Sequence, residues 1–172
     1  MPKFVADSSV SPTGLKWAAP AGASFVGASA ARDASFSVSA STATAIAFNT
    51  ADQFDTDAIH DTATNNTRFT IPSGKGGKWL CNISPMISGG TPGGGVRTVI
   101  FVNGAPKRRM SLGYISGNGE TEFPLTEILN VSAGDYIEFY VWQNFQTTAT
   151  FYCATSSTGE KQGTAQVVYL GA

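Results

Sequence analysis

Apolar residues along this chain alternate with polar ones in short runs, and a period of two is typical of β-strands that bury one face. The runs are "ASFSVSAS" (34–41), "AIAF" (45–48), "TRFTI" (67–71), "KWLCNI" (78–83), "VRTVIFV" (96–102), "RRMSLGYI" (108–115), "TEFPL" (121–125), "DYIEFYVWQ" (135–143), "TATFYCAT" (148–155) and "TAQVVYL" (164–170). Clusters of Gly, Pro, Asn or Asp separate most of them, as turns do. Helix is expected for at most one turn in 51–61 and another in 125–129. About ten strands predict an all-β sandwich or jelly roll.

The first 33 residues break this pattern. Residues 18–34 are rich in Ala, Gly and Ser and have no sustained period. We therefore predict an extended N-terminal arm over residues 1–33 and a β-domain over residues 34–172. The apolar residues of the arm are Phe4, Val5, Leu15, Trp17, Phe25 and Val26. They are too sparse for a separate core and are suited to becoming ordered on a partner, with Phe4, Val5, Leu15 and Trp17 as the anchor.

The run "DYIEFYVWQ" is apolar on both faces. Ile137, Phe139 and Val141 share one face, and Tyr136, Tyr140 and Trp142 share the other with Glu138. A sandwich strand with one wet face should instead alternate apolar with polar residues. The second face therefore packs against a loop or the arm of the same chain, or against another subunit. We favour a subunit interface made by Tyr136, Tyr140 and Trp142, because aromatic residues with polar tips are common there.

Residues 74–78, "GKGGK", look at first like a phosphate-binding loop. Such a loop connects a strand to a helix, and its lysine is followed by Ser or Thr. Here Lys78 is followed by Trp79 and by a further strand. Pro72 and the three glycines therefore predict a hairpin turn and no nucleotide site.

The charge balance limits the possible partners. The 172 residues carry 11 basic and 12 acidic side chains, a net charge of −1, so no global field attracts nucleic acid or an anionic membrane. We expect the one basic cluster, Lys107–Arg109, to be solvated at the start of a hairpin or to contact an acidic patch on a partner subunit. The N-terminus has no apolar segment typical of a signal peptide, and no run approaches a membrane span, so neither a signal peptide nor an anchor is expected.

Candidate catalytic groups are scarce. His60 is the single histidine, and no Gly-x-Ser-x-Gly motif accompanies it. The set Asp55, Asp57, His60 and Asp61 could ligate calcium or zinc, but its spacing matches no known metal loop, and we favour turn capping by the carboxylates.

Three further side-chain sets have ordinary explanations. Glu120 and Glu122 share one strand face, as a glycosidase pair could, yet strand carboxylates are usually solvated. Cys81 and Cys153 lie among apolar residues of predicted strands, which favours buried, inert thiols. Two cysteines cannot form a disulfide framework, so both are expected to stay reduced in a cytosol.

The order of these runs resembles C1q/TNF-like jelly rolls. The resemblance rests on "ASFSVSAS" (34–41), "AIAFNTADQFD" (45–55), "RFTIPSGKGGKWLCNI" (68–83), "VIFVNGAPK" (99–107), "LNVSAGDYIEFYVWQ" (129–143) and "AQVVYLGA" (165–172). It covers residues 34–172 and implies a threefold homotrimer. Animal members usually follow collagen repeats, which are absent from this sequence. The opening "MPKFVADSSVSPTGLKWAAPAG" (1–22) instead resembles the N-terminal arm of bacteriophage virion proteins that carry such a domain.

These observations predict a non-enzymatic virion structural protein, assembled in the host cytoplasm. It would form a trimeric knob on the capsid (decoration or head fibre) or on the tail, held by its arm. No cofactor, metal, nucleic acid or membrane insertion is expected. The alternative is a receptor- or glycan-binding adhesin of a phage tail or a bacterium, which would bind through residues 86–95 and 113–121, although the glycines there favour flexible spacers. An enzyme is disfavoured.

Overall fold

The computed structural model describes residues 4–6, 15–17, 25–88, 94–109, 113–114, 120–152 and 163–172. Strands and turns make up these residues; no helix occurs among them, and so none of the length and hydropathy needed to span a membrane. The helical turns expected in 51–61 and 125–129 are therefore not formed. Residues 125–129 instead lie in a strand, where Ile128 pairs with Leu80.

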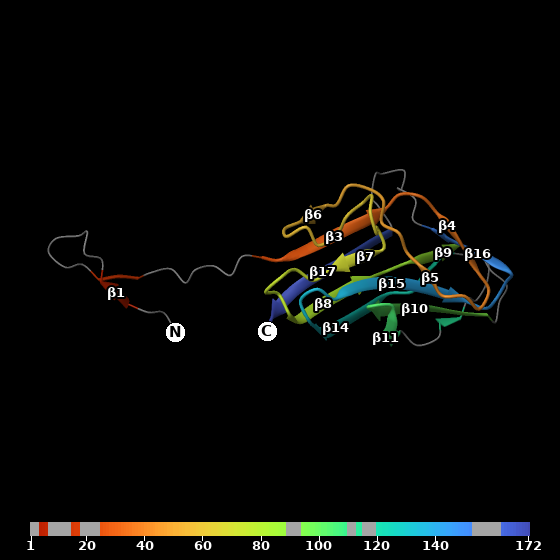
Figure 1. Cartoon of the computed structure of the whole chain (residues 1–172). Coiled ribbons are helices and arrows are strands. Elements are labelled where there is room, and N and C mark those ends of the chain that lie inside the picture. Colours follow the sequence, from red (N-terminus) through yellow and green to blue (C-terminus); the bar gives the residue numbers. More distant parts are fainter. Residues whose placement is uncertain are drawn as a thin grey trace.

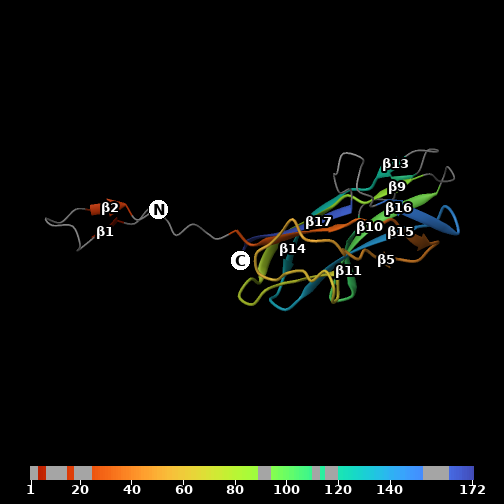
Figure 2. The same cartoon turned by 90° about the horizontal axis from the view of Figure 1, so that it is seen from above.

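Two main sheets face each other in a β-sandwich (Figures 1 and 2). The five-stranded sheet has the order β14 (Leu125–Val131), β8 (Gly77–Ile83), β17 (Gly163–Gly171), β3 (Gly27–Arg32) and β6 (Phe54–Asp55). The six-stranded sheet has the order β11 (Ala105–Arg109), β10 (Gly95–Val102), β15 (Tyr136–Gln143) and β5 (Thr44–Ala45), with β12 (Gly113–Tyr114) on β10 and β7 (Arg68–Thr70) on β15. The pairings in both are antiparallel.

A third sheet extends the sandwich at the end away from the C-terminus (Figure 2). Its order is β13 (Glu120–Glu122), β9 (Met86–Ser88), β16 (Thr148–Tyr152) and β4 (Phe36–Ser39). Two short strands, β1 (Phe4–Ala6) and β2 (Leu15–Trp17), pair only with each other, and their register places Phe4 opposite Trp17. The four predicted anchor residues thus all fall within these two strands.

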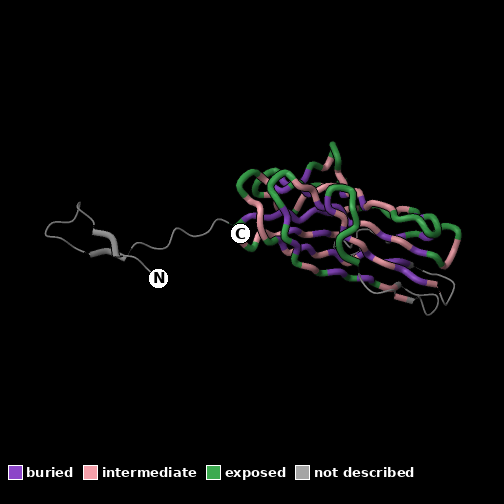
Figure 3. The backbone as a smooth tube through the Cα atoms, turned by 60° about the horizontal axis from the view of Figure 1, so that its bottom comes forward, coloured by how far each residue is buried: buried purple, intermediate pink, exposed green. Residues whose placement is uncertain are grey.

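The core fills the space between the sheets, where purple segments line the interior in Figure 3. Ile137, Phe139 and Val141 are completely buried, which confirms the predicted inner face of β15. Phe139 meets Phe69 edge to face, with ring centroids 5.7 Å apart. Trp79 is also fully buried, and its indole nitrogen donates to the Lys75 carbonyl at 2.9 Å. Burial of a polar-tipped aromatic ring therefore leaves no unpaired donor there.

The sandwich begins before residue 34. β3, which the sequence assigned to the arm, pairs with β17 on one side and β6 on the other. Its residues Gly27 to Ala31 are buried on both faces, so the strand shows no alternation of apolar and polar residues. Small side chains suit such a position, and the Ala/Gly/Ser composition that suggested a linker is a consequence of this packing.

The turn at residues 72–76 connects the two sheets and is not a hairpin. β7 before it pairs with β15, while β8 after it pairs with β14 and β17. The prediction of a strand, a turn and a second strand is confirmed, but the hairpin is wrong. Gly77 is required because its φ of 139° is unfavourable for other residues and a Cβ at this position would collide with the Gly171 backbone.

Candidate subunit interface

The acidic loop between β6 and β7 uses its carboxylates to hold its own backbone. Asp55 accepts hydrogen bonds from the amides of Ile59 and His60, both at 2.9 Å. Asp61 accepts from two following amides, and these bonds lower the pKa of its carboxyl. Such bonds are the turn capping that the sequence predicted for these aspartates. Within the described ranges, no three His, Cys, Asp or Glu side chains converge as metal ligands would.

His60 fixes the same loop to the core. Its side chain is fully buried, with Nδ1 3.0 Å from Asp52 Oδ1 and Nε2 3.2 Å from the Asn66 carbonyl oxygen. The ring stacks on Phe69 at a centroid distance of 5.1 Å. Burial raises the pKa of Asp52, and the nearby His60 opposes that shift. These contacts give His60 a structural explanation, with no serine or cysteine among its hydrogen-bond partners.

The other chemical candidates occupy ordinary positions. Cys81 is buried, and desolvation raises the pKa of its thiol to about 12. Glu122 accepts a hydrogen bond from the Ser84 hydroxyl at 3.2 Å. Cys153, the Glu120 side chain and most of the two adhesin loops lie outside the described residues.

The outer face of β15 is partly covered by neighbouring side chains of the same chain. The Arg68 guanidinium lies 4.1 Å from the Tyr136 ring centroid, and Tyr140 stacks on Phe101 at 4.0 Å. Partial burial and the adjacent Glu138 raise the pKa of the Tyr140 hydroxyl.

Trp142 is covered in the same way, by the Arg97 guanidinium 5.1 Å from its ring centroid. Tyr136, Tyr140 and Trp142 are all half-buried. Their role as an interface stays a prediction, since cover from the same sheet already accounts for much of their burial.

The five-stranded sheet has the more exposed apolar surface. Three large hydrophobic residues are exposed in the described part of the chain: Phe25 (53%), Ile128 (55%) and Leu170 (51%). All three lie on the outer side of this sheet. We define the apolar face as Phe25, Leu80, Ile128, Val168 and Leu170.

The register of the strands makes the apolar face continuous. Ile128 on β14 is opposite Leu80 on β8, and Leu80 is opposite Val168 on β17. Val168 is in turn opposite Gly27 on β3, whose missing side chain leaves room for the Phe25 ring. Leu170 follows two residues beyond Val168. A row of apolar side chains thus crosses four strands, and its members Phe25, Ile128 and Leu170 are each more than half exposed.

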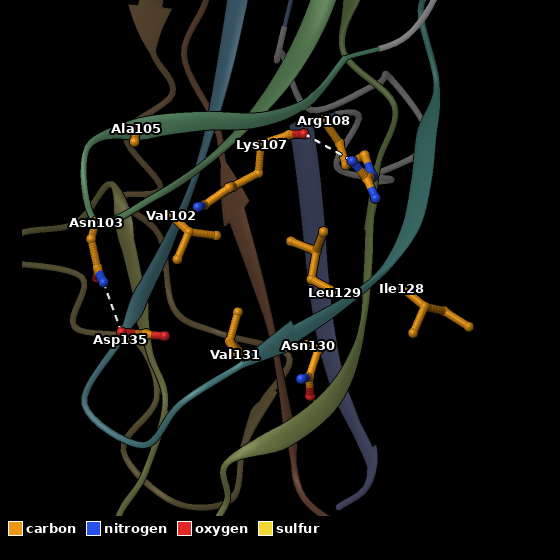
Figure 4. A pocket seen from close by; sticks show the side chains of 10 residues that line it. All are labelled: Val102, Asn103, Ala105, Lys107, Arg108, Ile128, Leu129, Asn130, Val131 and Asp135. Carbon is orange, nitrogen blue, oxygen red and sulfur yellow. Dashed lines mark hydrogen bonds between the residues drawn. The ribbon is translucent and has the colours of Figure 1, made fainter.

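A groove lies at the edge where β14 approaches β11 (Figure 4). Its volume is about 490 Å³, within the range of ligand-binding pockets. Val102, Leu129 and Val131 line it with apolar atoms, and Lys107 extends over them from β11. At one end the Asn103 amide donates to Asp135 at 2.7 Å. Ile128 belongs both to this groove and to the apolar face, so the two surfaces are contiguous.

No family model matches the sequence, and no curated protein matches it. Among solved structures, an Eiger TNF from S. frugiperda matches with a TM-score of 0.54, covering 86% of this chain and 93% of that chain. The fold is a TNF-like jelly roll. The two sequences are 11% identical, so the likeness extends to the fold alone. It confirms the predicted fold class, an all-β C1q/TNF-like sandwich.

Sequence reasoning missed the apolar face, although one signal was present. In "LTEILNV" (125–131), Ile128 occupies the same phase as Thr126 and Asn130, which is the solvent-facing one. An isoleucine there is out of place on a wet surface. The polar residues around it hid the signal, because a single exposed apolar residue is common in any protein.

Proposed function

We propose that this chain is a non-enzymatic structural protein that assembles into a homotrimer of jelly rolls and is mounted on a phage particle by its N-terminal arm. The observation that carries the proposal is the apolar face, which concentrates the exposed large hydrophobic residues on one side of one sheet. Contiguous exposed apolar patches are typical of interaction surfaces. The threefold symmetry follows the C1q/TNF resemblance, and the phage location follows the resemblance of residues 1–22.

The energy available from the apolar face suits subunit association. Full burial of a Leu, Ile or Phe side chain is worth about 1.5–3 kcal/mol, so side chains that are half exposed can each still gain about 0.8–1.5 kcal/mol. Ile128, Leu170 and Phe25 would together contribute about 2–5 kcal/mol for each subunit. This free energy would favour association, and it would be gained again at each subunit contact of the trimer.

Native mass spectrometry of the full chain at micromolar concentration tests the trimer. We expect three chains in the wild type and a shift towards monomer in Ile128→Asp, because a carboxylate would be buried without a partner. Thr150→Asp, an exposed position on β16, is the matched control and should stay trimeric. A wild-type monomer would refute the proposal.

Tyr140→Asp separates the two candidate surfaces. If the apolar face is the interface, this variant stays trimeric although its β15 face is disturbed. If the Tyr140→Asp trimer dissociates and the Ile128→Asp trimer does not, the interface lies on the outer face of β15, as the sequence first predicted. The proposal of a trimer would then be kept, with that face as its interface.

Deletion of the arm tests its attachment role. The deletion should remove residues 1–24 only, because β3 begins at Gly27 and its loss would open the five-stranded sheet. We expect the shortened protein to remain a folded trimer but to be absent from purified particles. Trp17→Ala should weaken incorporation without changing the melting temperature. Normal copy number of the shortened protein would place attachment on the jelly roll.

A further inference from the structure

Opposite edges of the sandwich carry opposite charge. Lys107, Arg108 and Arg109 on β11 are all exposed, and residues 103–109 contain no acidic side chain. Asp52, Asp55, Asp57 and Asp61 lie within the segment that contains β6 and the loop after it. The basic strand is an edge of the six-stranded sheet beside β14, whereas β6 is at the far edge from β14. Figure 1 shows β6 and β11 on opposite sides of the sandwich.

The basic edge contains the groove between β11 and β14. Val102, Leu129 and Val131 form an apolar surface within it, and Lys107 lies above them (Figure 4). The Nε atom of Arg108 lies 3.8 Å from Glu127 Oε2, and the Arg108 side chain is 59% exposed. The groove therefore combines an apolar floor with a rim on which Lys107 and Arg108 outnumber the single carboxylate of Asp135.

The acidic edge carries an aromatic pair, Phe25 and Phe54. Phe25 is 53% exposed and packs edge to face on half-buried Phe54, with ring centroids 5.4 Å apart. Asp55 follows Phe54 directly, and Asp57 is exposed two residues later. The edge opposite the groove thus combines two apolar rings with negative charge.

Building on the proposed trimer, we propose that the groove of one copy receives the Phe25–Phe54 pair of the next copy, with Arg108 facing Asp57. Because the two surfaces lie at opposite edges, the groove of a chain cannot contact the Phe25–Phe54 pair of the same chain. A twofold contact made edge to edge would place basic against basic or acidic against acidic edges, which costs energy. A head-to-tail contact matches opposite charges each time and can close into a ring.

The proposed contact between oppositely charged edges also determines which part of the apolar face is buried. Phe25 ends the apolar face on the acidic side, and Ile128 ends it at the groove. The contact between neighbouring copies therefore buries the two ends of the apolar face, Phe25 of one copy and Ile128 of the other. Charges at the rim of this contact select its direction, while apolar burial supplies most of its affinity.

Charge reversal in the full chain tests the contact. Asp57 is chosen because its side chain accepts only from the neighbouring Thr56 hydroxyl, unlike Asp55, which holds the loop backbone. Arg108→Glu and Asp57→Lys should each raise the concentration at which half of the trimer dissociates by about tenfold. The double variant should return it towards the wild-type value. This rescue should weaken at high salt.

A matched control has the same net charge. Arg108→Glu combined with Glu122→Lys, on β13, should show no rescue. If the Arg108→Glu/Asp57→Lys variant dissociates as readily as its weaker parent while Ile128→Asp still breaks a wild-type trimer, the head-to-tail match is refuted and the trimer stands. A wild-type monomer refutes both.

Discussion

Gln143 joins three segments at the end of β15, and its replacement tests how the sandwich is closed there. The side chain is fully buried. Its Nε2 donates to the carbonyls of Val38 and Gln146, both at 2.9 Å, and its Oε1 accepts from the amides of Phe145 and Gln146 at 3.0 and 3.3 Å. Gln143→Leu keeps a similar size but removes all four hydrogen bonds.

The cost follows from the backbone amides of Phe145 and Gln146, since each N–H can donate one hydrogen and loses Gln143 Oε1 as its acceptor. A buried unsatisfied group costs about 1–3 kcal/mol, and the half-buried Phe145 and Gln146 place both amides near the lower end. We expect Gln143→Leu to lose about 2–3 kcal/mol of unfolding free energy. For a domain of this size the melting temperature should fall by about 4–12 °C.

Urea unfolding followed by tryptophan fluorescence measures this change, at one fixed protein concentration because assembly contributes to stability. Gln146→Leu is the control, since that side chain makes one exposed hydrogen bond to the Thr148 carbonyl and should change stability by less than about 0.5 kcal/mol. If Gln143→Leu lies within about 1 kcal/mol of the wild type, this account of the four hydrogen bonds is wrong.

Three further predictions concern groups described above. Near pH 8, iodoacetamide should modify Cys81 no faster than the protein unfolds, because burial raises the pKa of its thiol to about 12; rapid modification of the native protein, seen by peptide mapping, would contradict this. The Asn103 hydrogen bond is the largest cause of the lowered pKa of Asp135, so its carboxylate adds stability above the usual pKa of 3.8, and this is lost as the pH falls through the folded pKa. The melting-temperature difference between wild type and Asp135→Asn should accordingly shrink in acid, and a constant difference would count against it. Chelator should leave the melting temperature unchanged because Asp55 and Asp61 bind backbone amides; a drop of several degrees would make them metal ligands.

The strands with one wet face were predictable from the sequence, and those buried on both faces were not. β8 alternates buried Trp79, Cys81 and Ile83 with less buried neighbours, so its period is visible in the residue order. β3 has no such alternation, because both its faces are covered and small residues fill them. Local pattern therefore located the start of the domain nine residues too late, at 34 rather than 25.

Pairing between distant strands was the second limit. The turn at 72–76 was recognised from its Pro and Gly residues, but nothing local indicates that β7 joins β15 while β8 joins β17. The candidate interface also depends on pairing between strands that are distant in the sequence. Ile128, Val168 and Phe25 are far apart along the chain, and only the register of four strands brings them into one row. Sequence alone supplied Tyr140 and its neighbours because they share a single strand.

The position of β17 has a consequence for biosynthesis. This C-terminal strand lies in the middle of the five-stranded sheet, between β8 and β3. Until it emerges from the ribosome, β3 and β6 are separated from β8 and β14, and the edges of β3 and β8 that will receive β17 remain open. Such edges can pair with other chains, and long-range β-pairing is slow. We therefore expect the five-stranded sheet to form only after β17 has been synthesised, with nascent chains depending on protection from aggregation until then.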